Sequence, residues 1–210
     1  MITETNRMKT SRERSIRRRR YKAVYHIVTE GKITEPSYFK LIANYIPETA
    51  HYTVSCIPSD TASIPSILEK AKSVSSSQLY EQDELWLVLD QDKESHLRHQ
   101  FEKLNAWIQK SPKARMAISV PRFEYWLLCH FEDSPRKENS RHDSYVAKYL
   151  PGYDREKNLS RHGTKITLQA IQHAIKVASR TPLEEFDSEC PGSNVWMLVE
   201  KLVPSQSNRS

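Results

Sequence analysis

The chain has 210 residues, of which 38% are hydrophobic and 28% are charged, and its mean hydropathy is −0.69. This length fits one domain, or one domain with an appendage. No apolar run approaches the roughly 20 residues of a membrane-spanning helix, and the N-terminus lacks the apolar core of a signal peptide. We therefore expect a protein of the cytoplasm that does not enter a membrane.

The positive charge is concentrated at the N-terminus. The net charge is +6, but residues 1–22 contain nine lysines and arginines and two glutamates, so the remainder carries −1. Residues 1–20 have few apolar side chains, and we expect a disordered basic arm. Such an arm, which ends in Arg17, Arg18, Arg19 and Arg20, suits salt-sensitive contacts with nucleic-acid phosphates. A solubilising tail or a lead into the first strand is the alternative.

Strands and helices alternate along residues 21–132. Runs rich in aliphatic and aromatic residues predict strands at Tyr21–Thr29, Tyr52–Ile57, Leu85–Leu89 and Arg115–Val120. Helices are predicted from Thr34 to before Pro47, from Ser63 to the serine-rich residues 73–77, from Ser95 to Ile108, and over Phe123–Phe131. This alternation favours an α/β fold with a mostly parallel four-stranded sheet flanked by helices.

The pattern changes after residue 132, and we expect residues 133–210 to form a helical appendage packed on the core. Helices are predicted over His142–Leu150, Ile166–Ser179 and Val195–Val203, and polar loops over Asp133–Asp143 and Tyr153–Gly163. The predicted organisation is therefore an arm at 1–20, a catalytic core at 21–132 and a C-terminal extension at 133–210.

The three cysteines, Cys56, Cys129 and Cys190, lie far apart and show no Cys-x-x-Cys spacing. Cys56 falls in a predicted strand and Cys129 in an apolar helix, where a buried thiol behaves as an ordinary apolar side chain. We expect structural or incidental roles for all three and a reducing, cytosolic compartment.

Acidic residues stand where three of the predicted strands end. Glu30 follows the first strand, Asp90 and Asp92 follow the third, and Glu124 comes soon after the fourth. Because sites in parallel sheets lie beyond the carboxyl ends of the strands, Glu30 and Asp90 are expected on the same edge. Carboxylates crowded there repel one another unless a cation lies between them. Since carboxylate oxygens suit Mg²⁺ or Mn²⁺, we predict a metal-dependent active site.

Each of these acids also has a structural interpretation. Glu30 is equally suited to a turn in which it pairs with Lys32, and Asp90 to capping a helix. Glu124 is a first-turn acid of the kind that the helix dipole favours. It lies, however, in the most apolar stretch of the chain.

Other polar side chains near these strand ends are weaker candidates. Lys32 and Arg122 are candidates to offset the charge of a phosphate, with solvated side chains as the alternative. His96 and His130 are candidate proton shuttles, although structural roles are favoured for both. The sequence contains no Cys/His set for zinc and no Gly-rich phosphate loop, so ATP hydrolysis would have to come from a partner.

Three segments, in this order, resemble the RloB family: His26–Lys40 (HIVTEGKITEPSYFK), Leu87–Asp92 (LVLDQD) and Ala117–Phe131 (AISVPRFEYWLLCHF). The basic approach to the first strand, and Pro191–Asn194 followed by a helix, also fit. RloB-like proteins look like a variant of the Toprim fold of topoisomerases, primases and overcoming-lysogenization-type nucleases.

The resemblance implies roles for the four acids. Glu30 would be a general acid/base or a metal ligand, Asp90 and Asp92 would bind Mg²⁺, and Glu124 would complete the acidic site. RloB-like proteins are found with restriction or abortive-infection systems, often beside an ATPase. The resemblance therefore implies an Mg²⁺-dependent nuclease acting on DNA or RNA in anti-phage defence, with an ATPase as a candidate partner. A non-catalytic nucleic-acid-binding or regulatory subunit, and another phosphotransfer activity, are the alternatives.

Overall fold

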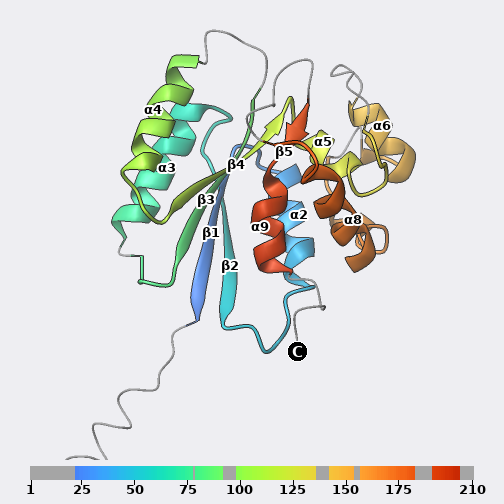
Figure 1. Ribbon diagram of the computed structural model, residues 1–210, viewed down its shortest axis with the longest axis horizontal. Helices are drawn as coiled ribbons and strands as arrows, with labels where there is room; N and C mark the ends of the chain where they lie inside the picture. Colours follow the sequence, from blue (N-terminus) through green and yellow to red (C-terminus); the bar gives the residue numbers. More distant parts are fainter. Residues whose placement is uncertain are drawn as a thin grey trace, which may run out of the picture.

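The sheet of this protein has five strands in the order β2-β1-β3-β4-β5. A computed structural model describes residues 22–77, 79–91, 98–135, 142–153, 157–182 and 191–203. The strands are β1 (Ala23–Thr29), β2 (Tyr52–Pro58), β3 (Glu84–Asp90), β4 (Ala114–Val120) and β5 (Gly192–Ser193). The first four are parallel and β5 is antiparallel to β4. The carboxyl ends of the parallel strands point toward the top of Figure 1.

Seven α-helices and one 3₁₀ helix surround the sheet in the described part of the chain. The α-helices are α2 (Thr34–Ala43), α3 (Ile64–Ser76), α4 (Arg98–Gln109), α5 (Phe123–Leu128), α6 (His142–Tyr149), α8 (Leu168–Ala178) and α9 (Val195–Leu202). The 3₁₀ helix η3 covers Ser160–His162. The side chain of Ser63 caps α3 by accepting a hydrogen bond from the Ser66 amide, and Thr167 caps α8 in the same way. The predicted α/β fold, with a mostly parallel sheet between helices, is confirmed.

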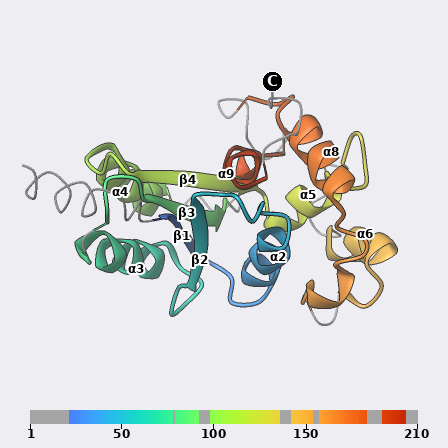
Figure 2. The ribbon, with the colours of Figure 1, turned by 90° about the horizontal axis from the view of Figure 1, so that it is seen from below.

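Different sets of helices cover the two faces of the sheet, as Figures 1 and 2 show. Successive residues of a strand point to opposite faces, so Val28 and Leu87 pack with α3 and α4, whereas Ile27 and Trp86 pack with α2 and α9. Helices α5, α6 and α8 extend the second layer beyond α2. Strands β3 and β4 are the most buried, and each has a neighbouring strand on both sides.

The sheet contains one strand that the sequence did not predict. Strand β5 pairs Ser193 with Ser119 and Gly192 with Val120. The side chain of Asn194, just after it, accepts a hydrogen bond from the Ile118 amide at 2.5 Å. Two residues are too few to show the alternation that identifies a strand, so a hydrophobic pattern could not reveal β5.

The residues after 132 share an apolar core with the sheet. Tyr153 and Leu159, in a predicted polar loop, are fully buried in the same cluster as Ile27 and Trp86. The prediction that this loop is polar throughout was therefore wrong. The division at residue 132 stays a prediction, and the predicted arm at 1–20 lies outside the described residues. Within those residues, no helix is long and apolar enough to cross a membrane.

Candidate functional site at the carboxyl edge of the sheet

Glu30 and Asp90 meet where the neighbouring strands β1 and β3 end. The Glu30 amide donates a hydrogen bond to the Val88 carbonyl at 3.0 Å, which continues the ladder between the strands. The Asp90 amide then donates to the Glu30 side chain, at 3.0 Å from Oε2. The Glu30 carboxylate therefore lies across the end of β3, where a hydrogen bond fixes one of its oxygens.

Glu35, in the first turn of α2, is a buried acid that the sequence interpretation missed. Its side chain folds back over the β1–α2 turn, where the Gly31 amide donates to Oε1 at 3.2 Å. Residue 31 must be glycine for this approach, since a Cβ there would lie 2.1 Å from Oε2 of Glu35. No specific signal distinguishes Glu35 in the sequence, because an acid beside Pro36 is common in the first turn of a helix.

The pKa of the Glu35 carboxyl is raised from an ordinary 4.5 to about 7. Burial is the largest cause, and hydrogen bonds from the backbone of Glu35 and Gly31 oppose it. The negative charges of Glu124 and Glu30 raise it further. Glu30 and Glu124 are therefore both close enough to Glu35 to influence its carboxyl.

Glu124 is buried in α5 and contacts the C-terminal part of the chain. The Tyr153 hydroxyl donates to Oε1 of Glu124 at 2.8 Å, and the Lys157 ammonium lies 3.7 Å from the same oxygen. Burial and the charge of Glu124 raise the pKa of Tyr153, so its hydroxyl stays protonated and donates. Lys157 also donates to Oδ2 of Asp143, on α6, at 2.6 Å. No spacing pattern could have connected Asp143, Tyr153 and Lys157 with Glu124.

Lys32 and Arg122 have exposed side chains on the two turns that flank this edge. Lys32 lies in the β1–α2 turn, and Arg122 is the N-cap residue of α5, directly after the cis bond between Val120 and Pro121. Asp92, His96, Cys190 and Arg17, Arg18, Arg19 and Arg20, which the sequence also singled out, lie outside the described residues.

The carboxylates of this edge include part of the metal-binding set that the sequence predicts. Their oxygens have the chemistry that Mg²⁺ and Mn²⁺ prefer. Within the described ranges, however, no group of three or more His, Cys, Asp or Glu side chains is arranged to hold a metal ion. Glu30 and Asp90 are the described members of the predicted set near this strand end, and Mg²⁺ is commonly held by one or two carboxylates together with water.

His130 has a structural role. Its Nδ1 lies 3.1 Å from the Trp126 carbonyl, which only accepts, so Nδ1 carries the hydrogen and Nε2 accepts from the Tyr38 hydroxyl at 3.2 Å. Burial lowers the pKa of His130 to about 4. The ring is therefore neutral near pH 7, and its two nitrogens are occupied within the core.

The thiols of Cys56 and Cys129 are also unreactive. Burial, followed by the charge of Glu35, raises the pKa of Cys56 to about 12, and burial raises that of Cys129 as well. Both side chains are free of disulfides. Thiolate chemistry at this edge is excluded for these two cysteines near neutral pH.

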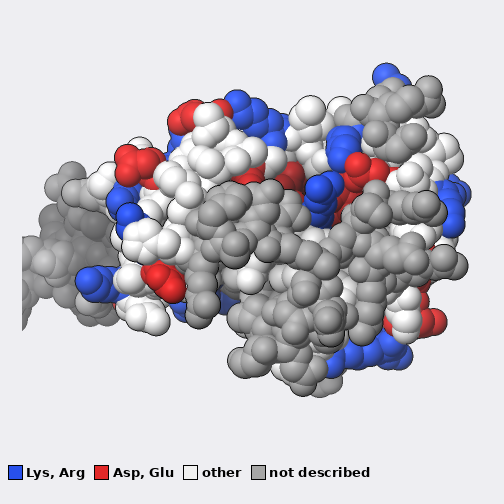
Figure 3. Space-filling model, turned by 90° about the horizontal axis from the view of Figure 1, so that it is seen from above, with Lys and Arg blue, Asp and Glu red and all other residues white. Residues whose placement is uncertain are grey.

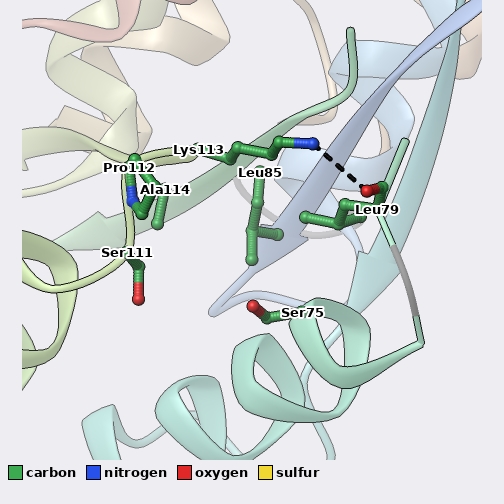
Figure 4. A pocket seen from close by; sticks show the side chains of 7 residues that line it. All are labelled: Ser75, Leu79, Leu85, Ser111, Pro112, Lys113 and Ala114. Atoms are coloured by element: carbon green, nitrogen blue, oxygen red, sulfur yellow. Dashed lines mark hydrogen bonds between the residues drawn. The ribbon is translucent and has the colours of Figure 1, made fainter. Parts of the chain in front are cut away.

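A small cavity of about 230 Å³ lies at the opposite edge, among the amino ends of β3 and β4 (Figure 4). Among the described residues that line it, Lys113 is the charged one, and its ammonium donates to the carbonyls of Leu79 and Tyr80. These contacts fix the lysine to the backbone and leave the cavity without an acid or a base for catalysis. The cavity is therefore separate from the acidic edge.

Acidic and basic side chains adjoin one another on the upper face of the molecule, toward which the parallel strands point (Figure 3). This mixture agrees with the contacts of Lys157 with two carboxylates. The fold and this edge define an α/β protein with a candidate acidic site at the carboxyl ends of its parallel strands.

The chain belongs to the RloB-like protein family, whose family model matches residues 25–202. The match extends from β1 to α9 and so includes Glu30, Asp90 and Glu124. Comparisons with curated proteins and with solved structures find no significant match.

Proposed function

We propose that this protein is a metal-dependent nuclease that hydrolyses phosphodiester bonds of DNA or RNA. The observation that carries the proposal is the hydrogen bond from the Asp90 amide to Oε2 of Glu30, which holds two acids together at adjacent strand ends. Parallel α/β sheets bind their ligands at this edge. Membership of the RloB-like family agrees with the Toprim-type order of a Glu after β1 and an Asp after β3.

Glu30, Asp90 and Asp92 would hold Mg²⁺ or Mn²⁺, with Glu124 at the border of the site. A bound ion would polarise the scissile phosphate and make water more acidic. The Glu30 carboxylate would be either a ligand of this ion or the general acid/base that accepts the proton of the attacking water.

The substrate must be attracted by separate positive groups, because the chain outside residues 1–22 carries −1. The basic arm, with Arg17–Arg20, would supply long-range attraction to phosphates. Lys32 and Arg122, exposed on the turns that flank the edge, would offset the charge of a phosphate within the site.

We place this activity in the cytoplasm, in anti-phage defence, with an ATPase as partner. Support comes from membership of the RloB-like family, since proteins of this kind are found with restriction or abortive-infection systems, often beside an ATPase. The sequence has no GxxxxGK[ST] phosphate loop, so any ATP hydrolysis would be the partner's.

The test is cleavage of plasmid DNA and of total RNA with Mg²⁺, with Mn²⁺ and with EDTA. We expect cleavage that EDTA abolishes and that Glu30→Gln removes. Metal-dependent cleavage that survives both Glu30→Gln and Asp90→Asn would contradict the assignment of the site.

A second candidate function is a non-catalytic nucleic-acid-binding or regulatory subunit. Two observations favour it: Glu124 has internal partners in Tyr153 and Lys157, and the described acids form no group of three metal ligands. The same assay separates the two functions. Absence of cleavage in every condition, including with a neighbouring ATPase added, would favour the binding subunit.

A further inference from the structure

We propose that Lys157 contacts a phosphate of the nucleic acid at this edge, and that Asp143 and Glu124 are positioning residues that aim its ammonium. The proposal rests on the proposed function in that the ligand is a nucleic acid. It does not require that the nucleic acid is cut.

The backbone holds Lys157 in an uncommon conformation. Its φ is 51°, in the left-handed region that is unfavourable for a residue with a side chain. Two hydrogen bonds fix it there: the Lys157 amide donates to the Tyr153 carbonyl at 2.8 Å, and the Thr34 hydroxyl donates to the Lys157 carbonyl at 3.2 Å. The second bond connects this segment to the start of α2, beside Glu35. The side chain therefore leaves a backbone that is fixed relative to the acidic edge.

The ammonium of Lys157 is held without being enclosed. It donates to Oδ2 of Asp143 at 2.6 Å and lies 3.7 Å from Oε1 of Glu124, beyond hydrogen-bond distance, while its side chain is 37% exposed. An ammonium has three N–H donors, and within the described ranges one of them has a hydrogen-bond acceptor. A phosphate oxygen can therefore be bound without breaking the contact with Asp143.

The ammonium of Lys157 keeps its positive charge near neutral pH. Burial lowers its pKa, but the hydrogen bond to Asp143 and the charge of Glu124 raise it more. The positive charge of Arg122 opposes that rise, so Arg122 is a second cation close to Lys157. A phosphate bound to the ammonium would therefore lie near two positive charges.

A lysine that served only to neutralise Glu124 would be expected to bond to it directly. Glu124 already accepts a hydrogen bond from Tyr153, whereas the ammonium bonds to the partly exposed Asp143 instead. The ammonium therefore lies closer to solvent than it would in a direct bond to the buried acid. This is the arrangement expected of a residue that binds a ligand.

The experiment measures binding of fluorescent single-stranded and duplex oligonucleotides in EDTA over a series of KCl concentrations. Each phosphate contact contributes about 0.7 to the slope of log K against log[salt] for single strands and about 0.9 for duplex DNA. We expect Lys157→Met, and Lys157→Gln as a second neutral variant, to weaken binding and to reduce the slope by about that amount. Lys157→Arg should keep the wild-type slope.

Lys201→Met is the matched control. Lys201 also lies 2.6 Å from a carboxylate oxygen, that of Glu84, and its side chain is similarly exposed at 42%, but it lies at the other end of β3. The Lys201→Met variant should bind the oligonucleotides with the affinity of the wild type and with the same slope of log K against log[salt]. Thermal unfolding confirms that each variant is folded.

Three results would overturn the proposal. The salt slope is unchanged in both neutral variants, Lys157→Arg loses as much affinity and slope as they do, or the wild type binds no oligonucleotide. Because EDTA prevents cleavage, the outcome does not depend on catalysis. A wild type that binds but never cuts contradicts the nuclease alone.

Discussion

The two ends of β3 both carry acids, but they use them differently. At the amino end, Oδ1 of Asp83 accepts from the Val24 amide at 2.8 Å and Oδ2 from the Tyr80 amide at 2.9 Å. Glu84 accepts from the Trp86 indole at 2.9 Å and pairs with Lys201 at 2.6 Å. Each acid there has donors or a cation as partners and helps to close the fold.

At the carboxyl end, the acids crowd one another instead. Glu30 lies across the end of β3, and the charges of Glu30 and Glu124 both raise the pKa of buried Glu35. Lys157 lies among these acids but is directed partly to solvent. Repulsion between buried acids costs stability, so an edge that retains it is a candidate for function, whereas an edge whose acids are all paired is structural.

The largest expected difference between the two ends is in cleavage. Asp90→Asn should reduce the rate by roughly 100-fold or more, which is the scale on which a metal ligand or proton-transfer group acts. Glu84→Gln, at the other end of the same strand, should leave the rate unchanged. Initial rates on plasmid DNA and RNA with Mg²⁺ measure both. Equal losses in the two variants would mean that the strand ends do not differ in function.

The second difference concerns the pH dependence of stability. The folded-state pKa of Glu35 is about 7, above the ordinary 4.5 of the unfolded chain, so the folded state binds the extra proton between these values. The contribution of this proton to the free energy of unfolding is complete below pH 4.5 and is lost as the pH rises through 7. At 1.36 kcal/mol for each pKa unit, the total loss is about 3 kcal/mol. Glu35→Gln should remove this loss, so the free energy of unfolding of the variant should rise relative to that of the wild type from pH 4.5 to 8.

Urea unfolding at each pH measures this gain. Glu69→Gln, an exposed acid on α3, is the control and should follow the wild type. If Glu35→Gln showed the same pH dependence as the wild type, the pKa of the buried Glu35 carboxyl would not be raised in the folded state.

The third expected effect is at the structural end. Asp83→Ala leaves the amides of Val24 and Tyr80 without their acceptor and should lower the free energy of unfolding by about 2 kcal/mol. Cleavage per folded molecule should not change. Chemical denaturation and an activity assay on the folded fraction test this. A loss of specific activity would contradict a purely structural role for the amino end of β3.

The smallest expected effect is that of Lys201→Met. An ion pair this exposed contributes about 0.5 kcal/mol, so the midpoint of urea unfolding should shift only slightly. Cleavage should be unaffected. A loss as large as that in Asp83→Ala would show that the pair with Glu84 is a main support of β3.

Much of this fold could be predicted from the sequence because its strands are continuous apolar runs. Leu85–Leu89 is buried on both faces of the sheet, which its composition indicates directly. The strand ends followed from the same runs, so the proximity of Glu30 and Asp90 could be anticipated. Placement of both acids at one edge needs only the parallel topology.

The remainder of the site depends on contacts between distant parts of the chain. Tyr153 and Lys157 reach Glu124 from about 30 residues away in a segment with no periodic pattern. Glu35 is distinguished only by its burial against Gly31, which a single sequence does not show. Strand β5 is too short to leave a pattern.

The most direct test of the central claim is Mn²⁺ binding to the metal-free protein, followed by electron paramagnetic resonance without any substrate. We predict that the wild type and Glu84→Gln bind Mn²⁺ and that Glu30→Gln and Asp90→Asn lose this binding. A wild type that binds no Mn²⁺, or an Asp90→Asn variant that binds it as tightly as the wild type, would contradict a metal site at the carboxyl edge of the sheet.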